Sequence, residues 1–275
     1  MINFSPLRTA RLQVTLRELS GRDAIALCQM PVESAEQGIT ELLKRIVVTP
    51  SREDLRKGQV TDQRQWSVQE RGLVAAHYMA HVIGGDFQVG DNGRYSDYLM
   101  ESGLGPPPEA VEISSVAGKT WFMQPLLGWH AEAIERLIFA DELQNDRNGW
   151  LIGAMAAQIY SADIGPMAGH DETDAMIDKA LAERANALVD LSESDLMALT
   201  MDYFDRQADI DHIFHLHIGM DGFCFLPAKK EAPGLSPARF PFSMALRQDT
   251  VEVFKPIAGT AGGDGAVPGP EPDDR

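Results

Sequence analysis

Residues 67–84 read SVQERGLVAAHYMAHVIG, and the rest of the chain can be organised around this segment. Ser67 and Glu70 have the spacing of a capping box, in which each side chain bonds the backbone N–H of the other, so a helix is expected to begin there. Gly84 and Gly85 supply its end. The segment predicts a long helix whose small and apolar residues pack on one face.

Two histidines of this helix are candidate metal ligands. His77 and His81 are four residues apart, so their imidazoles face the same way. A zinc-protease helix carries a glutamate directly after its first histidine, where this chain has Tyr78. The pair would need a third ligand, for which the candidates by residue type are His130, His170 and Asp86. The alternative is two histidines on a packed helix, one of them buried and hydrogen-bonded.

A second histidine cluster lies in residues 212–227, HIFHLHIGMDGFCFLP, which predict a β-hairpin that turns between Gly219 and Gly222. His215 and His217 are two residues apart and share one face of the first strand. With His212 just before the strand, the three form a set of the right ligand type for a metal. The alternative is that they form the polar face of an amphipathic hairpin.

The remaining pattern predicts an α+β fold that is mostly helical with short β-hairpins. Strands are expected at 10–17, 110–116, 119–126, 238–246 and 250–254. Further helices are expected at 21–30, 33–47, 129–143, 149–161, 173–190 and 193–209. These elements divide into a strand-helix region over 1–107, a helical region with hairpins over 108–256, and an acidic Gly/Pro tail over 257–275. The tail has almost no large side chains, so we expect it to be flexible or held by a partner.

Composition excludes several classes of partner. The chain has 275 residues and a net charge of −17, which disfavours binding to nucleic acid or to anionic lipid. We see no secretory signal peptide and no apolar run long enough to span a membrane. Cys28 and Cys224 each lie in an apolar context, which is typical of two buried thiols in a reducing cytoplasm.

The familiar catalytic motifs are missing from the sequence. It contains no phosphate-binding loop, no dinucleotide fingerprint, no nucleophile elbow and no paired CxxC cysteines. Because these motifs are missing, we expect a protein that is not an enzyme and that binds no cofactor.

The order of parts over residues 10–85 resembles tail and baseplate proteins of tailed bacteriophages, or their assembly factors. A strand with VTLREL is followed by SGRDAIAL, by a helix that ends TELLKRIV, and by QWSVQERGLVAAHYMA. The resemblance implies a structural or assembly protein whose partners are other virion tail proteins, with self-association as a further option. It also implies a place in the host cytoplasm during assembly or in the virion.

Two other functions stay open at this point. One is a small metal-dependent enzyme that uses His212, His215 and His217, with or without His77 and His81, and it predicts stoichiometric metal in the purified protein. The other is an acidic regulatory protein that masks a basic partner, and it predicts binding that weakens steeply with salt.

Overall fold

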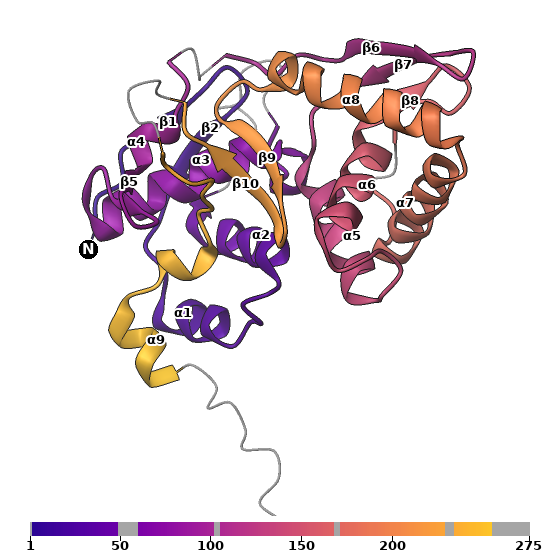
Figure 1. Cartoon of the computed structure of the whole chain (residues 1–275). Helices are drawn as coiled ribbons and strands as arrows, with labels where there is room; N and C mark the ends of the chain where they lie inside the picture. Colours follow the sequence, from indigo (N-terminus) through magenta and orange to yellow (C-terminus); the bar gives the residue numbers. More distant parts are fainter. Residues whose placement is uncertain (1, 49–59, 102–104, 168–170, 229–233, 255–275) are drawn as a thin grey trace, which may run out of the picture.

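The computed structural model describes residues 2–48, 60–101, 105–167, 171–228 and 234–254. Two lobes lie side by side (Figure 1). The second lobe is made of residues 111–210, and the first lobe contains the other described elements. Buried apolar side chains from both lobes form one continuous core. The predicted α+β class is confirmed, because helices dominate and the strands form small antiparallel sheets.

The first lobe is built from short elements around one central helix, α3. Its helices are α1 (Gly21–Cys28), α2 (Ala35–Ile46), α3 (Val68–Met79), α4 (Tyr95–Tyr98) and α9 (Gln248–Phe254). Its strands are β1 (Leu7–Arg8), β2 (Gln13–Leu16), β3 (Val47–Val48), β4 (Gln88–Val89), β5 (Gly93–Arg94), β9 (His215–Gly219) and β10 (Gly222–Leu226). The strand β2 pairs with both β1 and β3, and β4 forms a small hairpin with β5.

The helix α3 lies at the centre of the first lobe, and its predicted start is confirmed. The capping box of Ser67 and Glu70 is formed in both directions. Every α3 residue except His77 is buried. The helix continues as a π-helical turn, Ala80–Gly84, and the chain leaves it through Gly84 and Gly85 with φ angles of 123° and 42°. Positive φ angles favour glycine, which explains why the helix ends at these two residues.

The second lobe packs four helices against a three-stranded sheet. The helices are α5 (Gly128–Phe139), α6 (Arg147–Gln158), α7 (Asp174–Val189) and α8 (Glu193–Ile210). The strands are β6 (Val111–Val116), β7 (Lys119–Met123) and β8 (Ile159–Ser161), with β7 in the middle. The predicted hairpin of β6 and β7 turns at Ala117 and Gly118, both with positive φ. Residues 159–161 were expected in a helix but form β8, because they pair with β7.

The hairpin of β9 and β10 brings the chain back to the first lobe after α8. Its register places Cys224 opposite His217, and the predicted turn between Gly219 and Gly222 is confirmed. Phe225 stacks on Phe214 with ring centroids 4.4 Å apart and also contacts Gly72 of α3. The hairpin therefore closes the core around α3.

The two strands expected near the C-terminus are wrong. Residues 242–245 form a 3₁₀ turn, and residues 248–254 form α9. A five-residue segment with apolar side chains only at 251, 253 and 254 fits a strand and a helical turn equally well, so its surroundings decide which one forms. Here α9 packs on α1 rather than pairing with a strand. The predicted tail, 257–275, and most of the polar loop before Ser67 lie outside the described residues.

Gly38 on α2 is a position where one methyl group should be costly. A Cβ there would lie 2.1 Å from Cδ1 of the buried Phe242 ring. Gly38→Ala is therefore expected to destabilise the protein by about 1–3 kcal/mol in urea unfolding, although alanine favours helix. Gly21→Ala is the matched control, because its added Cβ would have no neighbour within 4 Å. Equal stability of the two variants would contradict the packing described for Phe242.

Candidate functional site

The first histidine pair is tied to the N-terminal segment. The Nε2 atom of His77 lies 2.8 Å from the carbonyl oxygen of Ser5, and Nε2 of His81 lies 3.1 Å from the Ser5 hydroxyl. The Nδ1 atom of His81 lies 2.8 Å from the carbonyl oxygen of His77. Burial lowers the pKa of His77. These contacts give both imidazoles ordinary hydrogen-bonding roles that anchor the start of the chain to α3.

The histidines near the hairpin occupy three different environments. His212 is buried beside the Ser67 hydroxyl, and burial lowers its pKa to about 4. His215 lies 3.3 Å from an Asp211 carboxylate oxygen, and this hydrogen bond raises its pKa. His217 is half-buried, and burial together with the charge of Arg147 lowers its pKa. His215 and His217 share a strand face as predicted, whereas His212 turns towards α3.

The candidate metal ligands among the described residues do not gather around one point, and His170 lies outside those residues. Within the described ranges, no group of three or more His, Cys, Asp or Glu side chains is placed to hold a metal ion. Metal binding by His77, His81, His212, His215 and His217 stays a prediction without geometric support. Cys28 and Cys224 are buried and free, as their apolar contexts predict.

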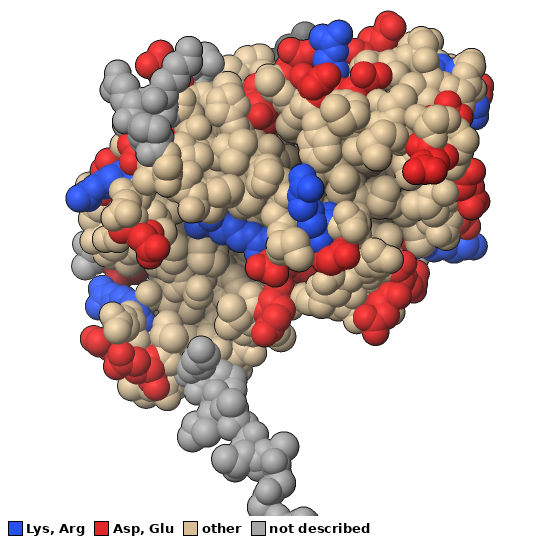
Figure 2. All heavy atoms as spheres, in the orientation of Figure 1, with Lys and Arg blue, Asp and Glu red and all other residues tan. Residues whose placement is uncertain are grey.

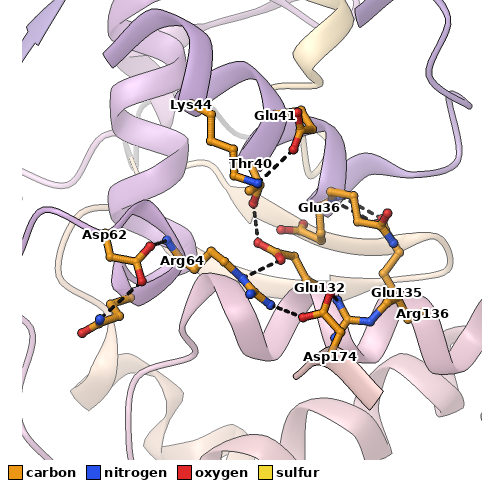
Figure 3. A network of polar contacts seen from close by, with 12 residues as sticks. Glu36, Thr40, Glu41, Lys44, Asp62, Arg64, Glu132, Glu135, Arg136 and Asp174 are labelled. Atoms are coloured by element: carbon orange, nitrogen blue, oxygen red, sulfur yellow. Dashed lines mark hydrogen bonds and ion pairs between the residues drawn. The ribbon is translucent and has the colours of Figure 1, made fainter. Parts of the chain in front are cut away.

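A different set of polar side chains does gather, at the junction of the two lobes (Figure 3). We call it the interlobe cluster. It consists of Glu36 and Thr40 on α2, Arg64 in the 3₁₀ turn Gln63–Gln65, Arg71 on α3, Glu132 and Glu135 on α5, and Asp174 on α7. Arg71, Glu132 and Glu135 are all buried, which is rare for charged residues unless they are paired.

Arg71 occupies the middle of the interlobe cluster. Its Nη2 atom donates to the Glu36 carbonyl oxygen at 2.6 Å and to the Thr40 hydroxyl at 2.7 Å. Its Nη1 atom lies 3.5 Å from a carboxylate oxygen of Glu132, which also accepts a hydrogen bond from Thr40. A Cβ on Gly128 would lie 2.3 Å from this Nη1 atom, so the start of α5 requires glycine for Arg71 to fit.

Arg64 continues the chain of charges towards the surface. Its Nε atom forms an ion pair with Glu132 at 3.0 Å, and its Nη2 atom donates to Asp174 at 2.7 Å. Asp174 lies 3.7 Å from Arg136, which binds Asp178 through two nitrogens. Ion pairs therefore run from the buried Arg71 to the exposed side of α7.

Glu135 caps a helix of the other lobe. Ser34 precedes α2 but makes no capping hydrogen bond with its side chain. The two carboxylate oxygens of Glu135 accept the backbone N–H groups of Glu36 and Gln37 at 2.8 and 3.0 Å instead. Burial raises the pKa of Glu135 to about 7, with Glu36 as a second cause. The cap joins α5 to α2 and places a titrating group at the junction.

Local sequence patterns could not reveal the interlobe cluster, because side chains that touch in it lie far apart in sequence, as Arg64 and Asp174 do at a separation of 110 residues. One usable signal was present. Glu132 and Glu135 stand among Trp129, Ala133 and Ile134 on a largely apolar helix, and carboxylates in such a place need partners. The arginines and carboxylates of the cluster are paired with one another across the two lobes. Arg64 Nε, Arg71 Nε and Arg71 Nη1 belong to these paired arginines but form no hydrogen bond among the described residues. The pairing across the lobes supports a structural role.

The helix α8 carries two apolar faces. Leu199, Tyr203 and Ile210 are buried against the second lobe. Met197, Met201 and Phe204 are 59%, 56% and 37% exposed, respectively. At about 100° per residue, these two sets point to opposite sides of the helix. We call Met197, Met201 and Phe204 the α8 stripe.

Comparison with protein-family models, with curated proteins and with solved structures found no match. Among the helices of the described residues, none combines the length and apolarity that crossing a bilayer requires.

Because the pKa of Glu135 is raised, we expect the free energy of unfolding to depend on pH. Between its ordinary pKa of 4.5 and the folded value of about 7, the folded state holds the proton more tightly than the unfolded state. The stability that Glu135 contributes is therefore complete below pH 4.5 and is lost as the pH rises through 7. The stability of the wild type relative to Glu135→Gln should fall steadily over this range in urea unfolding series.

The comparison with Glu135→Gln is needed because other groups titrate in the opposite sense. Burial lowers the pKa of His130 to about 3 and that of His212 to about 4, so their contributions are lost as the pH falls below 6.5. Both histidines remain in the variant, and their effects cancel in the difference. A difference that stays constant from pH 4.5 to 8 would contradict the shifted pKa of Glu135.

Proposed function

We propose that this protein is a non-enzymatic structural or assembly protein that acts through protein–protein contacts made by the α8 stripe. The single observation that carries the proposal is the second apolar face of α8. A helix needs one apolar face to pack on its own domain, and α8 already has that face. Three large apolar side chains at i, i+4 and i+7 on the opposite side fit a partner.

The composition of the α8 stripe supports protein contact. Methionine is flexible and polarizable, so methionine-rich surfaces adapt to a protein partner. Phe204 has Arg147 above its ring at 5.8 Å, and Phe and Arg are enriched at interfaces. Figure 2 shows acidic and basic side chains scattered over the visible face, rather than a single acidic patch. This distribution favours contact through apolar surface over the masking of a basic partner.

The place of the protein in a phage tail or baseplate is the part of the proposal that rests on the resemblance over residues 10–85. The interlobe cluster supports such a role, because buried ion pairs between the two lobes restrict their relative motion, and a virion component needs a fixed shape. A virion tail protein is accordingly the proposed partner of the α8 stripe.

The test places a photo-crosslinking amino acid at Met201 in the cells that make the protein. The control position is Ile83, which is 51% exposed and lies on the other lobe. We expect a crosslink from position 201 alone, with a virion tail protein identified by mass spectrometry. Met201→Glu should then weaken the binding of that partner at least tenfold, whereas Ile83→Glu should leave it unchanged.

The outcome of the crosslinking experiment tests the phage assignment and the contact surface on α8 separately. A crosslink to a non-virion protein would overturn the phage assignment but not the contact surface. Equal crosslinking from positions 201 and 83 would overturn the contact surface as well.

A further inference from the structure

A cavity of about 400 Å³ lies inside the second lobe, between the sheet, the end of α6 and one face of α7. Its walls are mostly apolar, and they include Trp121, Ala156, Ile159, Ile164, Ala180 and Leu188. Cavities of this volume are typical of small-molecule sites. The walls predict an occupant whose larger part is apolar.

Arg184 on α7 brings one positive charge to the wall of this cavity. Its Nε, Nη1 and Nη2 atoms donate to the carbonyl oxygens of Ala156, Gly165 and Ile159 at 2.7, 3.1 and 2.7 Å. A guanidinium has five N–H donors, so two remain beyond these three bonds. The three carbonyl contacts fix the position of the Arg184 guanidinium and leave its other two N–H donors for a ligand.

No carboxylate neutralises Arg184 among the described residues. Its guanidinium forms no ion pair there, and burial lowers its pKa without an acidic group acting against the shift. The other two charges on the cavity wall are already paired. Lys119 lies 3.4 Å from Asp163, and Glu183 lies 3.9 Å from Lys179. The cavity therefore offers apolar walls together with one uncompensated cation.

We propose that this cavity binds a medium-chain carboxylic acid, with its acyl chain against the apolar walls and its carboxylate on Arg184. A carboxylate accepts charge-assisted N–H bonds from a guanidinium, and Arg184 keeps two donors, one on Nη1 and one on Nη2, beyond its three carbonyl bonds. The apolar chain gains from leaving water, and the head group supplies the charge that Arg184 lacks. This site is separate from the α8 stripe and does not depend on the contact function proposed above.

The first experiment compares three probes on the unmodified protein by isothermal titration calorimetry. Decanoate has the chain and the charge, decanol has the chain alone, and acetate has the charge alone. We expect decanoate to bind at least tenfold tighter than decanol, and acetate not to bind measurably. Equal affinities for decanoate and decanol would overturn the role of Arg184, and the absence of decanoate binding would overturn the site.

Variants locate the binding in this cavity. Ala187 lines it from α7, so Ala187→Phe should fill the space and lower decanoate affinity at least tenfold. Asn186→Phe is the matched control, because Asn186 is an exposed neighbour on the same helix and should leave binding unchanged. Arg184→Gln should reduce decanoate affinity to that of decanol.

Arg184→Gln also removes contacts to the end of α6, so its fold is to be checked by circular dichroism. If it does not fold, the comparison of probes and the Ala187→Phe result still decide the proposal. Full decanoate binding by Ala187→Phe would place the ligand elsewhere and overturn the assignment.

Discussion

Arg71→Met is expected to lower the free energy of unfolding by about 3–5 kcal/mol. Arg71 is 1% exposed, and the side chains around it include the carboxylates of Glu36 and Glu132. Methionine fills a similar length but supplies no charge and no donors, so Glu36 and Glu132 lose their central cation and Thr40 loses a partner. Removing one partner of a buried ion pair costs more than the pair contributes, because the remaining charge stays out of water. Urea unfolding at pH 7 measures the loss.

Two further variants separate charge from packing in this result. Arg206→Met removes an exposed arginine paired with Asp209, and it should change stability by less than about 0.5 kcal/mol. Adding Glu132→Met to Arg71→Met should recover part of the lost stability, since two apolar side chains can replace a buried ion pair. A double variant that is less stable than Arg71→Met alone would show that the remaining contacts of Glu132 with Arg64 and Thr40 outweigh the relief of its uncompensated charge.

The elements that the sequence predicts well are those whose signals are local. The capping box at Ser67, the glycines at 84 and 85 and the turn of the second hairpin each combine a few neighbouring residues, and all three are confirmed. The segment 250–254 was misread as a strand because five alternating residues carry too little information. Its helix is decided by α1, which is more than 200 residues away in sequence.

The candidate site, in contrast, depends on contacts between residues that are far apart in the sequence. Histidines attract attention by residue type, yet His77 and His81 prove to bond the Ser5 region, a contact that no spacing within the helix could indicate. The interlobe cluster depends on contacts between α2, α3, α5 and α7, so its existence follows from tertiary packing. For α8 the periodicity predicts a helix, but only the packed structure shows which of its two apolar faces remains exposed.

Gln69 illustrates how much one buried side chain can carry, and Gln69→Leu is expected to destabilise the protein by at least about 3 kcal/mol. The Oε1 atom of Gln69 accepts the backbone N–H groups of His212 and Ile213 at 3.0 Å and of Phe214 at 3.1 Å. Its Nε2 atom donates to Asp211 at 2.8 Å. Leucine has a similar shape but accepts no hydrogen bond, and each buried donor left unpaired costs about 1–3 kcal/mol. Urea unfolding gives the total loss.

Amide hydrogen exchange tests where the loss of Gln69 acts. The segment 212–214 joins α8 to β9, so we expect these three amides to lose protection in Gln69→Leu while α5 keeps its own. Gln69→Glu retains an acceptor for the three N–H groups but places a second carboxylate beside Asp211, so its stability should lie between those of the wild type and the leucine variant. Gln88→Leu is the control, because the Gln88 amide is exposed and, within the described part of the chain, donates to carbonyls of its own turn. Unchanged protection at 212–214 would mean that water replaces the Gln69 oxygen, and α3 would then hold the hairpin through the Phe214 and Phe225 contacts alone.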